Sequence, residues 1–376
     1  MTAAGGKPKN GKAASRSATA EAREGETARG KRPARKGLPG LAGPKAEKKV
    51  ALALQGGGAH GAFTWGVLDA LIEDGRLAIE AMTGASAGAM NAVVLADGWL
   101  EGGPEGARRQ LRDFWHRVSR DGSLSPIQRT LFDQFLGYWS GTVWGDVWTR
   151  FASPYDTNPA NLNPLRDALA EFIDFGHVRA NKAVALFVSA TNVWTGKVEI
   201  FARDVLTAEH VMASGCLPTV FQAVEIDGVP YWDGGYTANP ALFPLFYETR
   251  TDDIVLVQIN PVERRTTPRT AAEISGRLNE VTFNSNLLRE LRAIDFVTRL
   301  IDEGKLSRDE YKRVMMHRID GTGILDQYHA ASKMNADWGL FQDLHRAGRK
   351  AAQAWLAKNY DSIGRESTLD LRETFG

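Results

Sequence analysis

The chain has one cysteine, Cys216, among its 376 residues. A single cysteine excludes an intrachain disulfide and fits a reducing compartment. Because no Cys/His pattern surrounds Cys216, we interpret it as a small buried apolar residue rather than a nucleophile. The chain also lacks an apolar run of about 18 residues, so we expect no membrane-spanning helix.

The first 49 residues lack aromatic side chains and hold 13 Lys/Arg against 4 Asp/Glu, a net charge of +9. A segment of this composition cannot bury a core, and we predict a disordered basic tail over residues 1–48. It has no apolar central region of a secretory signal, so we expect a cytoplasmic protein or one in peripheral contact with a membrane. The other 327 residues carry a net charge of −8, so the positive charge is concentrated in the tail. The tail is either a solvated linker or an electrostatic tether to anionic lipid or nucleic acid.

The whole chain is 43% hydrophobic, which suits a protein with a large core. Apolar runs predict buried strands at residues 49–55, 79–83, 183–191 and 254–259, with a partner strand at 197–202. Spacings of three and four predict helices at residues 60–74, 87–100, 105–119, 124–137, 208–215, 268–303 and 338–358. Asp227-Gly228 between two short apolar runs predicts a hairpin. The βαβα beginning predicts an α/β fold with a mainly parallel central sheet and helices on both faces.

A serine turn, Gly84-Ala85-Ser86-Ala87-Gly88, lies at the junction between the second strand and a helix. A Gly-x-Ser-x-Gly turn at this place holds the serine on a sharp, strained bend, with its hydroxyl exposed at the end of the sheet. The N–H groups at the start of the helix, that of Ala87 among them, favour a developing negative charge. Ser86 is therefore the candidate nucleophile.

A second glycine-rich loop, Gly56-Gly57-Gly58, follows the first strand. Its backbone has no side chains in the way, so its N–H groups can point at an oxyanion that forms beside Ser86. We therefore expect this loop, together with the Ala87 N–H, to form an oxyanion hole.

The same loop also fits a dinucleotide fingerprint, Gly56-x-Gly58-x-x-Gly61, with Glu80 about 20 residues later. In that alternative the loop would bind a pyrophosphate. However, Glu80 falls inside the second strand rather than at its end, and the serine turn would have no role.

The base is less obvious, because the chain has seven histidines. A Ser-His-Asp esterase would need one of the late histidines, but none of His317, His329 and His345 lies in a recognisable catalytic loop. Asp233 precedes the Gly234-Gly235 turn, which leaves its carboxylate little steric cover. A carboxylate within hydrogen-bond reach of Ser86 can act as the base directly, and burial would raise its pKa toward a useful value.

Taken in order, these motifs resemble the patatin-like phospholipases. The resemblance runs from about Lys49 to Pro261 and includes Gly56–Gly61, Gly84–Gly88 and Asp233–Gly235. Further stretches that look like the family are Ala190–Asn192 with Gly196, and Ala213–Pro218 with Phe221. The resemblance implies a patatin-like three-layer architecture with a catalytic domain over residues 49–262. Residues 263–376 would form a mostly helical extension that packs on the same domain.

The resemblance also implies hydrolysis of lipid acyl esters by a Ser86–Asp233 dyad without histidine. The implied oxyanion hole consists of Gly56, Gly57, Gly58 and Ala87. No metal or cofactor is implied, lipid is the implied partner, and we expect no nucleic acid. A catalytically weak lipid-binding or scaffold protein is the alternative of a different class.

One departure concerns the residue before the last glycine of the loop, where the family usually has Lys or Arg and this chain has His60. A neutral His60 would supply less positive charge for a lipid phosphate, which leaves a neutral acyl ester open as substrate. Aromatic residues between 132 and 148 also bear on the substrate, either as core or as an acyl-chain pocket or lid. They are Phe132, Phe135, Tyr138, Trp139, Trp144 and Trp148.

Overall fold

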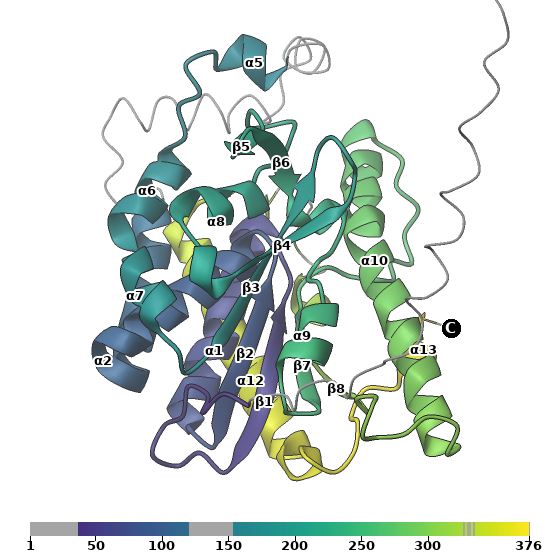
Figure 1. The fold of residues 1–376 in the computed structure, drawn as a ribbon. Helices are drawn as coiled ribbons and strands as arrows, with labels where there is room; N and C mark the ends of the chain where they lie inside the picture. Colours follow the sequence, from purple (N-terminus) through teal and green to yellow (C-terminus); the bar gives the residue numbers. More distant parts are fainter. Residues whose placement is uncertain (1–36, 120–152, 326–327, 329–331, 334, 376) are drawn as a thin grey trace, which may run out of the picture. The chain divides into compact units, whose positions relative to one another are not determined.

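A single sheet organises the part of the chain that the computed structural model describes, residues 37–375 without 120–152, 326–327, 329–331 and 334. Its strands there are β1 (Lys48–Leu54), β2 (Leu77–Gly84), β3 (Ala185–Asn192), β4 (Val198–Ala202), β5 (Val224–Ile226), β6 (Val229–Asp233), β7 (Asp253–Gln258) and β8 (Met315–Asp320). They follow the order β5-β6-β3-β2-β1-β7-β8, with β4 also paired to β3 (Figure 1). Strands β3, β2, β1, β7 and β8 are parallel, whereas the pairings of β4, β5 and β6 are antiparallel. The predicted mainly parallel sheet is confirmed.

The described helices are α1 (Gly61–Asp74), α2 (Ala87–Val118), α5 (Pro154–Thr157), α6 (Pro164–Phe172), α7 (Phe175–Ala180), α8 (Ala208–Ser214), α9 (Phe243–Glu248), α10 (Ala271–Asp302), α11 (Thr322–Leu325), α12 (Trp338–Asn359) and α13 (Leu371–Phe375). Short 3-10 helices lie at Gly58–His60, Arg203–Val205, Gly234–Tyr236 and Tyr360–Ser362. Helix α2 joins the two helices predicted at 87–100 and 105–119, with non-helical backbone at Gly102 and Gly103 where they meet. The helix predicted at 124–137 lies outside the described residues.

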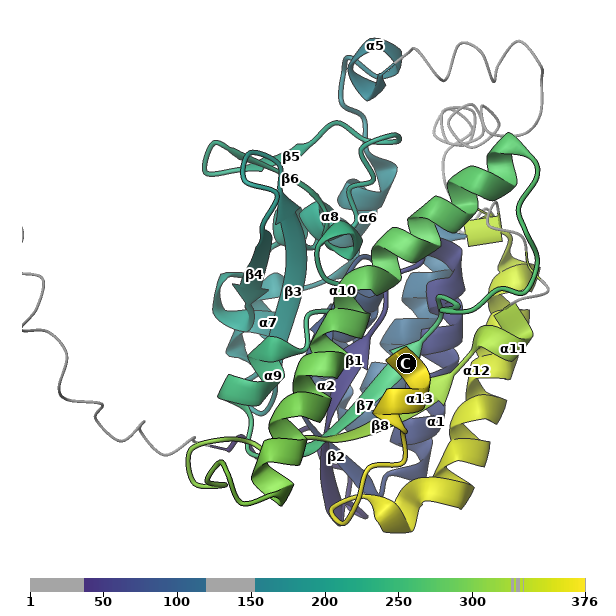
Figure 2. The ribbon, with the colours of Figure 1, turned by 90° about the vertical axis from the view of Figure 1, so that its right-hand side faces the viewer.

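Helices cover both faces of the sheet, so two apolar cores form. Strand β1 is apolar from Val50 to Leu54 because alternate residues point to opposite faces of the sheet, and helices cover both faces. Val50, Leu52 and Leu54 pack in the core that includes α1, α2 and α12. Ala51 and Ala53 pack in the second core, with α9 and α10. Figure 2 shows α10 running across one side of the sheet and α12 beside α1. The expected three-layer α/β architecture is therefore present.

The ordered domain begins earlier than residue 49. Leu41 is 1% exposed and forms an isolated bridge with Ile79. The Leu38 N–H donates to the Glu80 carboxylate over 3.1 Å. Residues 37–47 therefore pack against the domain, although we assigned them to the tail, because the two leucines anchor a segment that is otherwise mostly Gly, Pro and Ala.

Strand β8 was not predicted from the sequence. Its segment, MMHRID, breaks the apolar run with His317 and Arg318, as suits a strand at the edge of the described sheet. Residues 263–376 thus contribute a strand as well as helices.

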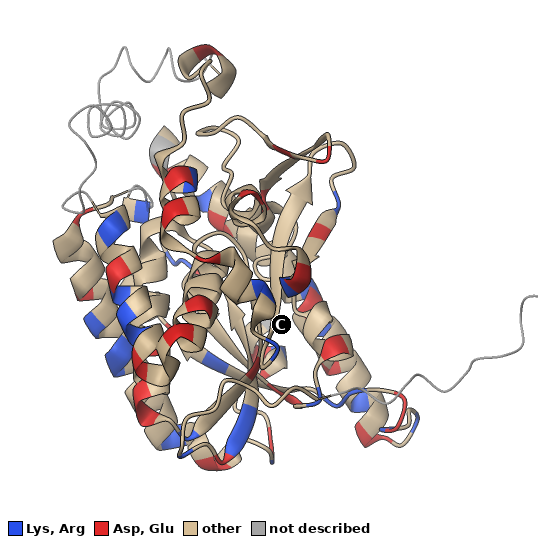
Figure 3. Ribbon diagram, turned by 60° about the vertical axis from the view of Figure 1, so that its left-hand side comes forward, with Lys and Arg blue, Asp and Glu red and all other residues tan. Residues whose placement is uncertain are grey.

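Within the described residues, no helix is both long enough and apolar enough to cross a bilayer. Figure 3 shows basic and acidic residues interspersed over the helices on the side that it draws.

Candidate active site

Ser86 lies between the carboxyl end of β2 and the start of α2, on a strained backbone. Its φ is 52° and its ψ is −124°, a conformation that a residue with a side chain rarely adopts. The turn is also tightly packed, because a Cβ added to Gly88 would lie 2.2 Å from the carbonyl oxygen of Leu54. The strained serine and the close approach of backbone are the features that the Gly-x-Ser-x-Gly pattern predicted.

Ser214, the last residue of α8, supports this turn. Its hydroxyl accepts a hydrogen bond from the Ser86 N–H over 2.8 Å, and it is fully buried. This role of Ser214 was not predicted, although the residue lies in the stretch Ala213–Pro218 that resembles the family. Nearby Cys216 is buried, and burial raises the pKa of its thiol to about 12, so the interpretation as a buried apolar residue is confirmed.

Asp233 ends β6 and is 1% exposed. Its Oδ1 accepts a hydrogen bond from the Gly235 N–H over 2.7 Å, whereas Oδ2 has no hydrogen-bond partner among the described residues. The Ser86 hydroxyl is nevertheless close enough to favour the ionised carboxylate. Burial outweighs both effects and raises the pKa of Asp233 to about 7. The fold thus brings together two residues that are far apart in the sequence.

The loop after β1 lies directly against the serine turn. A Cβ added to Gly56 would be 2.7 Å from the Ser86 Cβ. The Gly56 N–H, however, donates to the Asn239 side chain over 2.6 Å. The N–H groups of Gly57, Gly58 and Ala87 donate no hydrogen bond within the described part of the chain.

Buried amide side chains hold this loop from behind. The Gln55 Oε1 accepts from the backbone N–H groups of Ile259 and Asn260, each over 2.9 Å. The Asn260 Nδ2 donates to the Gly56 carbonyl over 2.7 Å, and the Asn239 Nδ2 donates to it over 3.3 Å. These residues were not predicted, since single Asn and Gln residues carry no pattern.

His60 is buried and remains neutral. Burial, together with the charges of Lys333 and Arg264, lowers the pKa of His60 to about 3. Its Nε2 lies 2.7 Å from the Ser332 hydroxyl, and its Nδ1 has no partner in the described residues. His60 therefore adds no positive charge to the glycine loop.

The other candidate residues lie in different environments. His317 pairs with Asp253 over 2.9 Å, and His345 pairs with Asp69 over 3.1 Å. Because Asp253 begins β7, the His317 pair lies toward the amino ends of the parallel strands, whereas Ser86 follows a carboxyl end. Glu80, the residue required by the dinucleotide alternative, accepts from the Thr251 N–H over 2.8 Å and is not near the end of its strand. His329 and the aromatic segment 132–148 lie outside the described residues.

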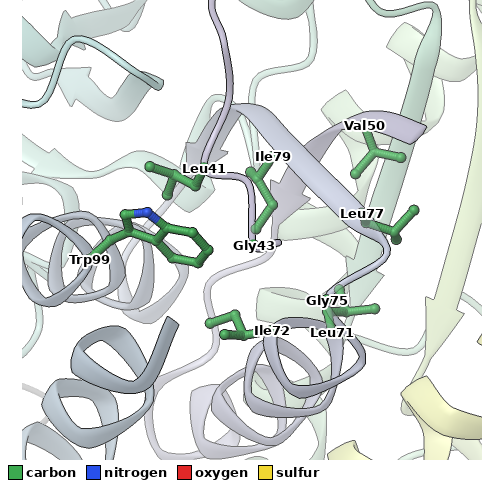
Figure 4. A pocket seen from close by; sticks show the side chains of 9 residues that line it. All are labelled: Leu41, Gly43, Val50, Leu71, Ile72, Gly75, Leu77, Ile79 and Trp99. Atoms are coloured by element: carbon green, nitrogen blue, oxygen red, sulfur yellow. The ribbon is translucent and has the colours of Figure 1, made fainter. Parts of the chain in front are cut away.

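A small crevice in the described structure lies at the opposite end of the central strands from Ser86 (Figure 4). Its lining residues are Leu41, Gly43, Val50, Leu71, Ile72, Gly75, Leu77, Ile79 and Trp99. They include the first residue of β2, so the crevice lies toward the amino ends of the strands. Its volume of about 10 Å³ is room for roughly one water, which excludes a lipid site there.

The chain matches the family model of the patatin-like phospholipases over residues 52–246, and no curated protein matches it. The structure of VipD from Legionella pneumophila is similar at 16% identity and a TM-score of 0.36, over 86% of this chain and 72% of that one. A structure of full-length SpcU with full-length ExoU from Pseudomonas aeruginosa is similar at 16% identity and a TM-score of 0.30, over 86% of this chain and 59% of that one. The family model alone spans just over half of the sequence, including the glycine loop, the serine turn and Asp233. The chain therefore belongs to the patatin-like phospholipase family.

Proposed function

We propose that the protein is a serine acyl hydrolase that cleaves lipid acyl esters with a Ser86–Asp233 dyad. One observation carries the proposal: a serine on a strained turn at a helix start lies near a buried carboxylate whose Oδ2 has no hydrogen-bond partner among the described residues. A base is most effective when its pKa is near the working pH, and the pKa of Asp233 is about 7. Membership of a phospholipase family supports a lipid ester as substrate.

In the proposed first stage, the Asp233 Oδ2 takes the proton of the Ser86 hydroxyl while Oγ attacks the ester carbonyl carbon. The carbonyl electrons move to oxygen, and the N–H groups of Gly57, Gly58 and Ala87 stabilise this oxyanion. The carbon–oxygen bond to the leaving alcohol then breaks, and the alcohol takes the proton from Asp233. The product is an acyl ester on Ser86.

In the second stage, Asp233 takes a proton from water while the water oxygen attacks the acyl carbon. Collapse of the second tetrahedral intermediate releases the fatty acid, and the Ser86 oxygen regains its proton from Asp233. The Gly56 N–H is already engaged by Asn239. In this mechanism Gly56 therefore allows the close approach to Ser86, and the two glycines after it donate.

Hydrolysis of p-nitrophenyl esters and of a phospholipid by wild type, Ser86→Ala and Asp233→Asn tests the dyad. Each variant should lose about 1,000-fold or more in kcat, because residues of one catalytic unit fail together. Matched controls are Ser275→Ala and Asp343→Asn at exposed positions of α10 and α12, which should keep full activity. Hydrolysis that survives Ser86→Ala would refute the dyad.

A second candidate is an esterase for neutral acyl esters, favoured by the neutral His60 beside the glycine loop. It uses the same dyad and differs only in substrate. A higher kcat/KM for a monoacylglycerol than for a phospholipid with the same acyl chain would favour it.

A further inference from the structure

A short segment outside the family match, Ser332 and Lys333, contacts the glycine loop at three points. The Ser332 hydroxyl lies 2.7 Å from the Nε2 of His60. The Lys333 ammonium donates to the Asn260 Oδ1 over 2.8 Å. The Lys333 backbone carbonyl lies so close to Gly58 that a Cβ there would be 2.3 Å from its oxygen.

The contact with Asn260 determines how that amide is oriented. An ammonium can only donate, so Asn260 must turn its Oδ1 toward Lys333 and its Nδ2 away. The Nδ2 then donates to the Gly56 carbonyl over 2.7 Å and lies 3.3 Å from the Gln55 Oε1. Lys333 is thus linked through one intervening side chain to Gly56, the first residue of the loop, which Asn239 also holds.

The partly buried environment of Lys333 would destabilise a lysine relative to an apolar residue, so stability alone does not explain a lysine at this position. Within the described residues it forms no ion pair, and its one hydrogen bond goes to a neutral amide. Part of its side chain is exposed, yet burial, the largest cause, lowers the pKa of its ammonium to about 8. The negative charge of Glu280 opposes this effect only in part, so withdrawing the cation from water is unfavourable. An apolar side chain would avoid this cost but would leave the buried Asn260 Oδ1 without its donor.

Gly58 completes the contact. Its φ of +58° lies in the left-handed region that favours glycine, and the Lys333 carbonyl fills the space where a side chain would be. The loop is therefore packed, backbone against backbone, on the side that Lys333 covers. At the other end of the loop, Gly56 packs against the Ser86 side chain.

We propose that Ser332 and Lys333 form a clamp that holds the Gly56–Gly58 loop in the geometry needed to donate to an oxyanion. Both are positioning residues, since they act through His60, Asn260 and the loop backbone. The catalytic consequence of the clamp rests on the proposed function, whereas the restraint of the loop does not. The clamp makes residues beyond the family match part of the active-site support.

Amide hydrogen exchange tests the restraint without reference to activity. In Lys333→Met, the peptide that contains residues 56–60 should exchange about tenfold faster than in wild type, because local opening becomes easier. The matched control is Lys350→Met, which removes an exposed lysine of α12 and should leave this peptide unchanged. Equal exchange in wild type and Lys333→Met, with both proteins folded, would overturn the clamp.

Kinetics test the positioning role. Lys333→Met should lower kcat for a p-nitrophenyl ester about tenfold and change KM by less than about twofold, because a displaced donor affects the transition state most. Lys333→Arg should restore most of the activity, since a guanidinium also only donates. A loosened loop with unchanged kcat would overturn the role. If wild type shows no Ser86-dependent hydrolysis, the proposed function fails, and hydrogen exchange still decides whether the clamp exists.

Discussion

At the scale of single residues, the proposed dyad depends on a carboxylate that is removed from water. Water would stabilise its ionised form and keep its pKa low. Asp233 is buried, and the pKa of about 7 that results gives the proposed base the strength usually supplied by histidine. The histidine nearest to the glycine loop cannot take that part. The pKa of His60 is lowered to about 3, and its Nε2 faces Ser332. Burial therefore shifts the two pKa values in opposite directions: it raises the pKa of Asp233 and lowers that of His60, because it disfavours the charged form of each.

The raised pKa of Asp233 predicts how stability depends on pH. The unfolded chain ionises this carboxyl near its ordinary pKa of 3.8, whereas the folded chain holds the proton until about pH 7. The stabilisation that the protonated form provides is thus fully present below about pH 4 and is lost as pH rises to about 7. Asp233→Asn has no carboxyl group to ionise, so the variant does not lose this stability as pH rises. Its Tm should exceed that of wild type by an amount that grows between pH 4 and pH 7.

Thermal unfolding of both proteins at a series of pH values measures the difference. At pH 8 the variant should be more stable by up to about 4 kcal/mol, since each pKa unit corresponds to about 1.4 kcal/mol. The difference between the two proteins isolates Asp233 from other groups, such as Glu290, whose pKa burial also raises to about 7. A constant difference across this range would mean that Asp233 is ionised with its ordinary pKa.

At the scale of elements, the site forms because neighbouring parallel strands end at the same edge of the sheet. Strands β1 and β2 pair in register up to Leu54 and Gly84, so the glycine loop and the serine turn emerge side by side. This much could be predicted, because each strand, turn and helix start is encoded in consecutive residues. The antiparallel β6 then brings Asp233 beside Ala190 of β3.

The support of the site could not be predicted in the same way. Asn239, Asn260 and Lys333 act through single side chains that meet across the fold, and an isolated Asn or Lys has no periodicity to reveal it. Strand β8 was missed for a related reason. Its position at the edge of the described sheet tolerates charged residues, which interrupt the apolar run that marked the central strands.

The pairing of β7 with β8 predicts the effect of changing a buried histidine. His317 on β8 contacts Asp253 on β7 and the Thr368 hydroxyl, each over 2.9 Å. His317→Asn should lower the free energy of unfolding by about 1–3 kcal/mol, because buried polar groups lose their partners. The kcat of the folded variant should stay within about twofold of wild type. Denaturant unfolding and ester hydrolysis measure the two effects.

The same variant distinguishes the dyad from a Ser-His-Asp esterase. A catalytic histidine would cost several orders of magnitude in kcat while stability changed little. His345→Gln provides the matched comparison, since His345 also pairs with a carboxylate, Asp69, on another helix. A collapse of kcat in either folded variant would contradict the histidine-free mechanism.

At the scale of the whole molecule, charge is divided unevenly along the chain. Residues 1–36 hold 10 Lys/Arg and 3 Asp/Glu, a net charge of +7. Residues 37–376 hold 36 Lys/Arg and 42 Asp/Glu, a net charge of −6. An anionic lipid surface would repel the second part on average and attract the first. If the enzyme is recruited to such a surface by net charge, the first 36 residues supply the attraction.

Deleting residues 1–36 should therefore weaken binding to vesicles that contain phosphatidylserine by about 100-fold or more at low salt, because each basic residue near the surface contributes about 1 kcal/mol. The cut belongs at residue 36, since Leu38 and Leu41 pack on the domain and a longer deletion would disturb the fold. Sedimentation with vesicles measures the binding. The Tm of the truncated protein should match that of the full chain.

Two further measurements separate electrostatic recruitment from other causes. Binding of the full chain should weaken as salt rises from 50 to about 300 mM, because screening shortens the range of the attraction. Replacing the lysines and arginines of residues 1–36 by glutamine should reproduce the deletion, since length is kept and only charge is lost. Hydrolysis of a water-soluble ester should remain unchanged in both variants, because the dyad lies in the domain. Equal vesicle binding with and without the basic residues would mean that the domain itself recognises the lipid surface.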